Sequence, residues 1–543
     1  MKRISKYILA AAVMALSASV CASSQVLTME EREAVAANID NYLSSDFQSV
    51  VKSVKVTSDK VIIKGKCAKW GKYILADITP WQDITELETF PYSKKIWFKW
   101  FKIKMDRVVL DREGIDYDRV FSKWAVVKVD GENQILDSFA RYADEVAPKA
   151  SPEALPLKTK KGFAAGSGDM YIQEIKDLGI ASITQNIWLD RVISAEEGSD
   201  FTYGGKNFKI GKGADGMEKV LTSIQDQGVV VSAILLCPNE SVYRDPENAG
   251  GFYTMPNLTS AEAFNVYAAV IEYLAQRYTS GEHGRISHWI MHNEVDMGHE
   301  WTNMGEQPEA RFFDRLMKST RIVYNIVRQY DQNASVLHSF THNWVNGDKP
   351  GFAPKSFLDR TLDYCAKEGD FRWGVAYHPY PQDLSKPKFW IDDVERSTFS
   401  RNSDYITFYN LEVLNDWILQ PEHFYQGAKR VLFLSEQGTN SPSYSEEDMA
   451  LQAAGGAWAW KKVAALEGID AMQWHGWADG KWEFGLRIGL HTFDEGDVPA
   501  LQRKPVWYMW EAAGTENEDA VFDQYLPVIG IDSWDQIFHE VTE

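Results

Sequence analysis

Cysteine is scarce in this sequence of 543 residues, which contains only four. Cys21 lies in the N-terminal segment, while Cys67, Cys237 and Cys365 are far apart, odd in number and without paired spacing. Disulfide frameworks and zinc knuckles need clustered, regularly spaced cysteines, so the sequence predicts neither. With 45% hydrophobic and 13% aromatic residues, the composition is instead that of a globular protein.

Positive charge is also in short supply. The chain has 57 Lys and Arg residues against 77 Asp and Glu residues, for a net charge of -20. A nucleic-acid-binding protein needs a basic face to meet phosphates, and electrostatic capture by anionic lipid needs one as well. The charge therefore argues against both partners and fits a soluble protein with a neutral or cationic small partner.

Long apolar runs are absent from the sequence that follows the N-terminal segment. No stretch there reaches the eighteen uninterrupted apolar residues that a membrane span needs. The N-terminus itself has three basic residues, an apolar run over 8–16 and a small-residue cleavage site after Ala22. This pattern predicts a secretory signal peptide over residues 1–22, and hence export to the periplasm or the exterior. A lipid anchor on Cys21 is an alternative, but Val20 is a poor residue before a lipidated cysteine.

The region up to residue 147 differs in texture from the rest. Its segments alternate apolar and polar residues with short polar breaks, as in SVKVTSDKVIIKGKC and KWAVVKV. Period-two patterns predict antiparallel strands, so we expect a mainly β, sandwich-like domain over residues 26–147. The Pro- and Lys-rich segment 148–160 is predicted to be a linker.

From residue 161 to 543, short apolar runs alternate with longer helical stretches. Eight strand candidates begin at Lys161, Ala181, Val229, Ile286, Ser335, Trp373, Arg430 and Ile469. Strands that alternate with helices imply parallel βαβ units, and eight such units make a (β/α)8 TIM barrel, an α/β fold. An open doubly wound sheet is the second interpretation, but no glycine-rich phosphate loop follows the first strand.

Two carboxylates close strands of this predicted barrel. Glu294 ends the fourth strand in HWIMHNEVDMG, and Glu436 ends the seventh in RVLFLSEQG. Strand ends of a barrel form one mouth, where strands four and seven face each other, so the two side chains can converge. Hydrolysis of a glycosidic bond needs such a pair, one to protonate the leaving oxygen and one to attack or to activate water.

At these residues the chain resembles the retaining glycoside hydrolases of clan A, which are (β/α)8 barrels. The resemblance rests on Asn293-Glu294 at strand four and Glu436 at strand seven, covers about residues 160 to 514, and suggests a bacterial branch without an assigned substrate. It implies Glu294 as acid/base and Glu436 as nucleophile. Clan members often carry an Arg from an early strand near the nucleophile, and Arg191 cannot be assigned that role.

The same resemblance implies further substrate-binding residues. Asn293 would hold the hydroxyl next to the anomeric carbon. YHPYP on strand six is similar to the His-x-Tyr of several members, which implies a site role for His378 and for Tyr380, the latter bonded to the nucleophile. Trp474, at the end of strand eight, would be an aromatic floor for the sugar.

Three more residues are candidates from their positions. His342 ends strand five and could be either a site residue or a core histidine. Trp188, at the end of strand two, is expected at the rim of the substrate cleft, and Trp477, in the loop after strand eight, is expected to line an outer subsite.

Other functions stay open at this point. The segment HNEVDMGHE is rich in potential metal ligands, but no HExxH motif or recognisable ligand triad appears, so no catalytic metal is predicted. A bound structural Ca²⁺ is compatible with the sequence. A carbohydrate-binding protein on an inactive barrel and a metal-dependent hydrolase are the alternatives. The aromatic segment 97–101, WFKWF, could bind sugar, although structural support is the favoured interpretation.

The sequence thus predicts an exported retaining glycoside hydrolase that needs no cofactor. Its substrates would be β-D-glycosides or their α-L counterparts, by the resemblance. Loop sequences set the sugar, the linkage and exo or endo action, and neither these nor the oligomeric state follow from the sequence.

Overall fold

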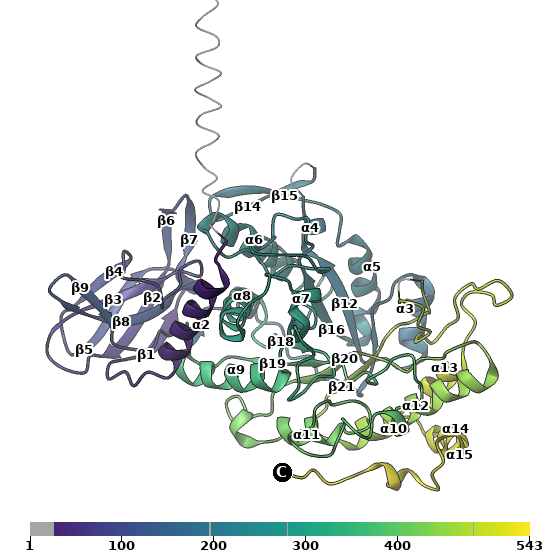
Figure 1. Ribbon diagram of the computed structural model, residues 1–543. Helices are drawn as coiled ribbons and strands as arrows, with labels where there is room; N and C mark the ends of the chain where they lie inside the picture. Colours follow the sequence, from purple (N-terminus) through teal and green to yellow (C-terminus); the bar gives the residue numbers. More distant parts are fainter. Residues whose placement is uncertain (1–25, 195–196, 280, 482) are drawn as a thin grey trace, which may run out of the picture.

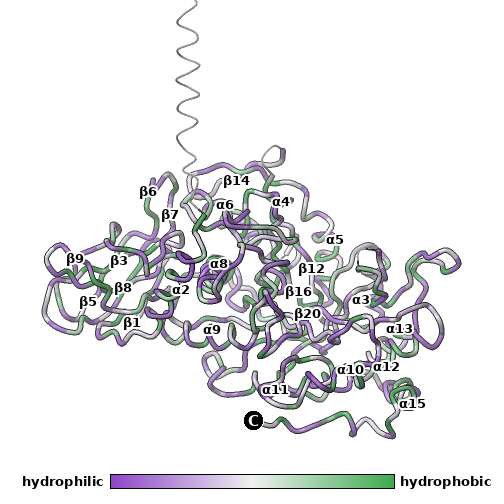
Figure 2. Tube along the Cα trace, in the orientation of Figure 1, coloured by the Kyte–Doolittle hydropathy of each residue, from purple (hydrophilic) through white to green (hydrophobic). Residues whose placement is uncertain are grey.

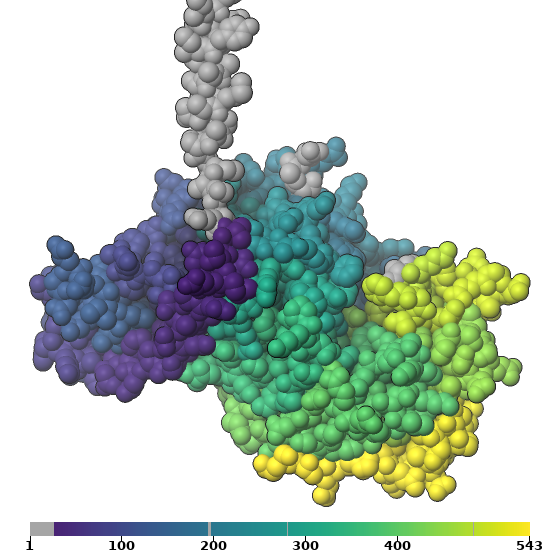
Figure 3. All heavy atoms as spheres, viewed as in Figure 1, coloured from purple at the N-terminus to yellow at the C-terminus, as the bar shows by residue number. Residues whose placement is uncertain are grey.

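The computed structural model describes residues 26–194, 197–279, 281–481 and 483–543. The predicted signal peptide, with Cys21, lies outside the described residues. A β-rich N-terminal lobe sits beside a larger barrel, and the C-terminal segment runs along the barrel's outer side (Figures 1 and 3). None of the described helices combines the length and apolar character needed to span a bilayer.

Two four-stranded sheets form the N-terminal lobe, in the orders β10-β1-β2-β5 and β4-β3-β8-β9. The strands are β1 (Val50–Val56), β2 (Lys60–Lys66), β3 (Lys72–Ile78), β4 (Ser93–Ile96), β5 (Trp100–Asp106), β8 (Lys123–Asp130), β9 (Asn133–Leu136) and β10 (Glu145–Val146), with a separate hairpin of β6 (Val108–Arg112) and β7 (Ile115–Asp118). Inward side chains such as Val54, Ile63, Leu75 and Val126 are fully buried in one hydrophobic cluster. The alternating pattern therefore forms the predicted sandwich.

Helix α2 (Met29–Leu43) ties this lobe to the barrel helix α9 (Pro354–Glu368). The Tyr42 hydroxyl donates to Glu368 at 2.7 Å, and Lys123 of β8 donates to the same carboxylate at 2.9 Å. These groups are buried, so separating lobe and barrel would leave charges without partners in an apolar surface. The contact thus fixes the lobe against the barrel.

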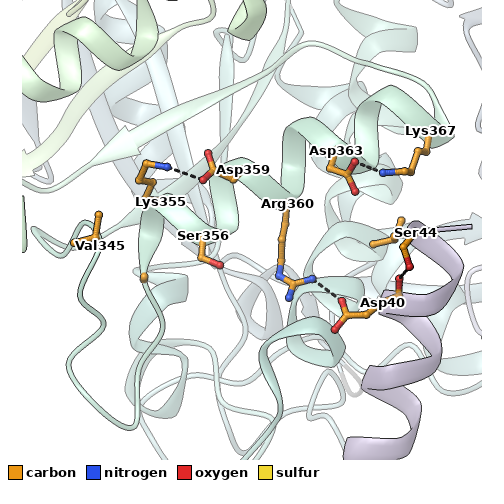
Figure 4. Close-up of a pocket in the computed structure, with 11 residues that line it drawn as sticks. Asp40, Ser44, Val345, Lys355, Ser356, Asp359, Arg360, Asp363 and Lys367 are labelled. Carbon is orange, nitrogen blue, oxygen red and sulfur yellow. Dashed lines mark hydrogen bonds and ion pairs between the residues drawn. The ribbon is translucent and has the colours of Figure 1, made fainter. Parts of the chain in front are cut away.

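A hollow of about 600 Å³ lies where α2 meets α9 (Figure 4). Its charged side chains pair with one another: Lys355 donates to Asp359 at 2.7 Å, and Arg360 donates to Asp40 at 2.8 Å. Because these carboxylates already have counter-ions, the hollow is a surface feature of the lobe–barrel contact, and the chemistry has to be sought at the strand ends.

Eight parallel strands close the predicted barrel, which is confirmed. They are β11 (Lys161–Ala164), β12 (Ser182–Trp188), β16 (Val230–Leu236), β17 (His288–Met291), β18 (Ser335–Phe340), β19 (Trp373–Tyr377), β20 (Leu432–Gln437) and β21 (Ala471–Trp474). Register contacts such as Phe163 with Trp474 close the ring. Strands such as β16, β18 and β19 are buried along their whole length, and Figure 2 places these strands in the interior of the larger lobe.

Helices surround the barrel. The main ones are α3 (Asp169–Asp177), α5 (Asp215–Ile224), α6 (Ala261–Arg277), α8 (Glu309–Tyr330), α9, α11 (Glu412–Ile418), α12 (Glu446–Ala465) and α13 (Pro505–Ala512). Short helices α4 (Leu189–Val192), α7 (Gly298–Trp301) and α10 (Phe389–Asp392) and a small sheet of β13 (Ile193–Ser194), β14 (Ser199–Tyr203) and β15 (Lys206–Ile210) lie in the loops that follow strands. The C-terminal segment adds α14 (Glu518–Phe522) and α15 (Leu526–Ile529).

The two ends of the barrel differ in character. Leu155 and Leu157, just before β11, pack against the apolar cluster inside the barrel, so this segment covers the end where strands begin. The opposite end, where the strands finish, carries polar residues and the long loops. We call that end the barrel mouth.

Candidate active site

Glu294 stands just past β17 on a backbone that side chains rarely adopt. Its φ is 39°, and His292, two residues earlier, has a φ of 61°. Non-glycine residues with such angles are costly and collect at functional sites. The amide of Glu294 donates to the Ser339 hydroxyl at 3.1 Å, which fixes the turn against the neighbouring strand β18. The sequence run HWIMHNE thus ends with its carboxylate turned into the mouth.

Glu436 lies on β20, where the strand changes register against β21 between Leu434 and Gln437. Such an irregularity re-aims side chains at the end of a strand. The Tyr380 hydroxyl donates to Glu436 Oε1 at 3.3 Å. Burial raises the pKa of Tyr380 well above its ordinary value, so the phenol keeps its proton and remains a donor.

The two carboxylates converge, as the sequence predicts. One oxygen of Glu294, one of Glu436 and a ring nitrogen of His378 all lie within 4.8 Å of one another. Carboxyl groups of retaining glycosidases are about 5–5.5 Å apart, and inverting enzymes need a wider gap to hold a water. The observed spacing fits direct attack by one of the two on a sugar bound between them.

His378 holds Glu294 in place. Its Nδ1 is 2.8 Å from Glu294 Oε1, and its Nε2 is 3.1 Å from the Ser435 hydroxyl, in the residue before Glu436. The ring is completely buried, and burial lowers its pKa although nearby carboxylates oppose this. A neutral imidazole between the two strands therefore couples the position of Glu294 to the strand that carries Glu436.

The protonation state of Glu294 suits a general acid. Its side chain is 13% exposed. Burial raises its pKa to about 8, the Glu300 carboxylate adds to the rise, and His475 opposes it. Glu294 is therefore mostly protonated at neutral pH, which is the state that can give a proton to a leaving oxygen.

His475 is a further member of the site, directly after β21. Burial alone would lower its pKa, but the carboxylates of Glu436, Glu483 and Glu294 outweigh burial and raise it to about 9. Its Nε2 lies 3.2 Å from Glu483 Oε1. The sequence places His475 at a strand end but gives it no role, because the loop that brings Glu483 back to it cannot be folded by inspection.

Asn293 carries a buried amide oxygen without a hydrogen-bond partner among the described residues. Its backbone carbonyl accepts a bond from the Thr302 hydroxyl at 3.0 Å, so the residue is fixed from behind. An unpaired buried polar atom is costly, and a ligand hydroxyl would satisfy it. The position next to Glu294 agrees with the role that the resemblance implies.

Aromatic rings continue from the end of β12 along the mouth. The Trp188 indole donates to the Tyr253 hydroxyl at 3.3 Å, Tyr253 stacks on Trp301 with centroids 6.2 Å apart, and Trp301 stacks on Phe252 at 4.7 Å. Trp301 follows Glu294 by seven residues. Trp188 thus lies at the end of β12, and the loops add three aromatic residues that only their conformation brings together.

Trp474 does not form the predicted aromatic floor. It is fully buried, its indole donates to the Ile488 carbonyl at 2.9 Å, and its ring packs against Trp510 of α13. The alternation at the strand end turns Trp474 outward, toward the helices, and leaves His475 facing the carboxylates. The predicted role of Trp474 as an aromatic floor is therefore wrong, and the adjacent residue His475 is the one near the carboxylates.

Trp477 is also drawn away from the carboxylates. Its indole donates to Glu174 of α3 at 2.6 Å, and the same buried carboxylate accepts from Trp507 at 3.0 Å and contacts His491 at 2.8 Å. These contacts fasten the loop after β21 to α3. Trp477 therefore anchors this loop to α3. Its contacts do not support the outer-subsite role expected from its position.

His342 and His292 have structural surroundings. The His342 ring packs edge-on against Tyr405, and its backbone carbonyl accepts from the Ile406 amide at 2.8 Å. His292 contacts the Leu235 carbonyl and the Ser319 hydroxyl, each at 3.2 Å, between β16 and α8. Burial lowers the pKa of both to about 4, so both are neutral. His342 is partly exposed, whereas His292 is buried.

Within the described ranges, Glu294, His378 and Glu436 are also the one group with the spacing of metal ligands. His292, Asp296 and His299 of the segment HNEVDMGHE do not join them. Asp296 is buried and accepts from the Thr341 amide at 2.9 Å, which ties the loop after β17 to β18. A metal bound by this group would use the carboxylate pair itself.

The family model named DUF5722, a family of unknown function, matches residues 153–537. This match takes in all eight barrel strands and both carboxylates. The chain belongs to DUF5722. No curated protein matches the chain.

Three solved structures are similar to it at low identity. A family 39 glycoside hydrolase from the gut symbiont Bacteroides cellulosilyticus WH2 has a TM-score of 0.44 and 13% identity over 87% of this chain and 83% of that chain. Xylanase 10B from Thermotoga maritima has a TM-score of 0.42 and 15% identity over 68% and 97%. A Bacteroides uniformis beta-glucuronidase has a TM-score of 0.38 and 10% identity over 87% and 50%. At this similarity, function has to be argued from the site.

Proposed function

We propose that the protein is an exported glycoside hydrolase that acts with retention, with Glu436 as nucleophile and Glu294 as acid/base. One observation carries the proposal: an oxygen of Glu294 and an oxygen of Glu436, from facing strands, lie within 4.8 Å of each other, and burial raises the pKa of Glu294 to about 8. A double displacement needs two converging carboxyl groups, one of which can donate a proton.

In the first step, a Glu436 oxygen attacks the anomeric carbon and forms a glycosyl ester. The bond from that carbon to the leaving oxygen breaks, and this oxygen takes the proton of Glu294. Tyr380 orients the attacking carboxylate through its 3.3 Å hydrogen bond. His378 keeps the Glu294 carboxyl directed at the leaving oxygen.

In the second step, Glu294 is ionised and removes a proton from a water at the same carbon. The hydroxide adds there, the ester bond to Glu436 breaks, and the sugar leaves with its original anomeric configuration. Charge at Glu294 is now favoured by the cationic His475, which opposes the effect of burial on the Glu294 pKa. One carboxyl group thus serves as acid and then as base.

The surrounding residues supply binding. Asn293 presents its unpaired amide oxygen to a sugar hydroxyl, and the ring series of Trp188, Tyr253 and Trp301 offers apolar faces to pyranose rings. By the family resemblance of the strand-end motifs, the substrates are β-D- or α-L-glycosides. No step requires a cofactor.

Two other functions are distinguishable. A metal-dependent hydrolase is favoured by the ligand-like spacing of Glu294, His378 and Glu436. A carbohydrate-binding protein would use the aromatic rings and Asn293 alone. The first would lose activity with a chelator, and the second would bind sugar without releasing any.

The test is reducing-sugar release from a broad panel of plant, algal and host glycans. The wild-type chain is compared with Glu436→Ala, each with and without chelator. We expect release by the wild type, loss in the variant, and no effect of chelator. Release that survives Glu436→Ala would rule out this residue as nucleophile, and loss with chelator would replace the proposal by the metal-dependent one.

A further inference from the structure

The first sheet of the N-terminal lobe exposes a face that is rich in lysine. Strands β1, β2 and β5 bury alternate residues, which leaves the other set outward. We call this surface the outer face. It carries seven lysines, namely Lys52, Lys55, Lys60, Lys64, Lys66, Lys102 and Lys104. Figure 1 shows β5 at the border of the lobe that points away from the barrel.

This concentration of charge opposes that of the whole chain. Residues 50–104 contain twelve lysines, no arginine and five acidic residues, whereas the whole chain has a net charge of -20. Lys55 pairs with Glu145, and Lys60 pairs with Asp106. The other five lysines of the outer face make no ion pair with any described residue. Their charge is available to a ligand.

The arrangement costs stability within the sheet. Lys64 and Lys102 are direct partners across β2 and β5, and Lys104 lies opposite Ile62. Like charges directly opposite on neighbouring strands are destabilising. A bound anion would neutralise the repulsion between Lys64 and Lys102, which would account for two lysines at directly opposite positions.

Aromatic side chains adjoin these lysines. Trp100, which is 59% exposed, lies opposite Lys66 in the sheet, and the ammonium groups of Lys52 and Lys66 are 4.5 and 5.1 Å from its ring centroid. Trp97 and Phe98 precede Trp100 in the turn from β4 and are exposed as well. Exposed large aromatic residues beside unpaired cations mark a recognition surface.

We propose that the outer face binds a linear anionic polysaccharide, whose carboxylate or sulfate groups meet the lysines and whose rings pack on Trp100. On a sheet, outward residues are about 6.5–7 Å apart along a strand and about 4.8 Å apart between strands. The lysines therefore stand on a regularly spaced set of strand positions, which matches a polymer with repeated charges better than it matches a single small anion. The role of this face extends beyond the proposed hydrolysis and does not depend on it.

A polysaccharide is favoured over an anionic membrane. Lys64, Lys102 and Trp100 lie on one face of the paired strands β2 and β5, which a thin chain can follow. A bilayer would meet a whole side of a molecule with a net charge of -20. Attraction to exposed lysines fades within about 8 Å at physiological ionic strength, so close contact along the face is required.

The test is affinity electrophoresis of the full chain carrying Glu436→Ala, in gels that contain polygalacturonate, chondroitin sulfate or neutral dextran. The double variant Lys64→Gln/Lys102→Gln is compared with Lys206→Gln/Lys212→Gln, which removes the same charge from exposed positions after β14 and β15. We expect retardation by one or both anionic polymers and none by dextran. We expect Lys64→Gln/Lys102→Gln, the sandwich double variant, to weaken binding by at least about fivefold. We expect Lys206→Gln/Lys212→Gln, the control variant, to bind as the parent chain does.

Further measurements decide between outcomes. Weaker retardation with added salt and with Trp100→Ala would support the proposal, and polymer preference would tell carboxylate from sulfate. An unchanged melting temperature of the sandwich double variant would show that its fold is intact. Equal weakening by both double variants, weakening by neither, or binding only to phosphatidylserine-containing vesicles would overturn the proposal. Because no arm requires hydrolysis, these results are independent of the proposed catalytic pair.

Discussion

The barrel mouth and the outer face of the N-terminal sandwich use ionisable groups in opposite ways. At the mouth, Glu294 is mostly buried, paired with His378, and has a pKa of about 8. On the outer face, Lys64 and Lys102 are exposed and lack ion-pair partners among the described residues. Burial changes the chemistry of a group, while exposure keeps its charge available.

The difference separates catalysis from attachment. A general acid must hold its proton near neutral pH, which requires removal from water. A surface that follows a polymer must keep full charges in water and needs no shifted pKa. The mouth should therefore respond sharply to single substitutions and to pH, and the outer face to salt.

The largest expected effect is at Glu436. Replacement by Ala removes the atom that attacks the sugar, so we expect kcat/KM to fall by about 10⁴-fold or more. Initial-rate kinetics on the substrate found by the glycan panel would measure this. Glu300→Gln is the matched control, because Glu300 is a nearby carboxylate that is about half exposed. A comparable fall in both variants would contradict the assigned nucleophile.

Glu294→Gln should reveal the acid by its dependence on the leaving group. Gln cannot give a proton, so we expect a loss of about 10²–10⁴-fold for a natural glycoside. An aryl glycoside with an acidic phenol needs little protonation, so its first step should slow far less. Comparing the two substrates in single-turnover kinetics tests this, and an equal loss on both would speak against a proton-donating role.

The pH dependence should report the proton of Glu294. Because the acid must be protonated and its pKa is about 8, kcat/KM should fall as pH rises through about 8. His475 lowers the pKa of Glu294, so His475→Gln should move this limb to higher pH by several tenths of a pH unit to about one. If the pH at which kcat/KM falls is the same in the variant, His475 does not influence the pKa of Glu294.

The smallest expected effect is on stability, and it has a definite sign. The Glu294 pKa is raised from an ordinary 4.5 to about 8, so the folded state holds a proton that the unfolded state loses, and stability falls as pH rises between these values. Glu294→Gln does not titrate and should stabilise the protein by about 2 kcal/mol at pH 6 and by more at pH 9. Urea denaturation at pH 6 and pH 9 should show the larger gain at pH 9, and the reverse order would contradict the raised pKa.

The sequence predicts the barrel well because its signals are local. Eight apolar runs separated by helical stretches become eight strands, and strand ends define one mouth, so Glu294 and Glu436 meet as expected. The family resemblance of YHPYP predicts His378 and Tyr380 at the site, and both contact the carboxylate pair. The strand order alone places only the two carboxylates.

Residues outside the strands are harder to predict. A one-residue difference at the end of β21 decides whether Trp474 or His475 faces the carboxylates, and the sequence pattern does not decide it. Trp301 and Tyr253 come together only through two loop conformations. Trp477 is turned aside by Glu174, a residue 303 positions away. Long-range contacts of this kind have no signature in a single sequence.

The stereochemistry of the first product is the most direct test of Glu436 as the nucleophile of a retaining reaction. Proton NMR of a fresh digest records the anomeric configuration before mutarotation. Because an oxygen of Glu294 and an oxygen of Glu436 lie within 4.8 Å of each other, we expect a product with the configuration of the substrate. A first product with the inverted configuration would show that a water attacks directly and would contradict Glu436 as nucleophile.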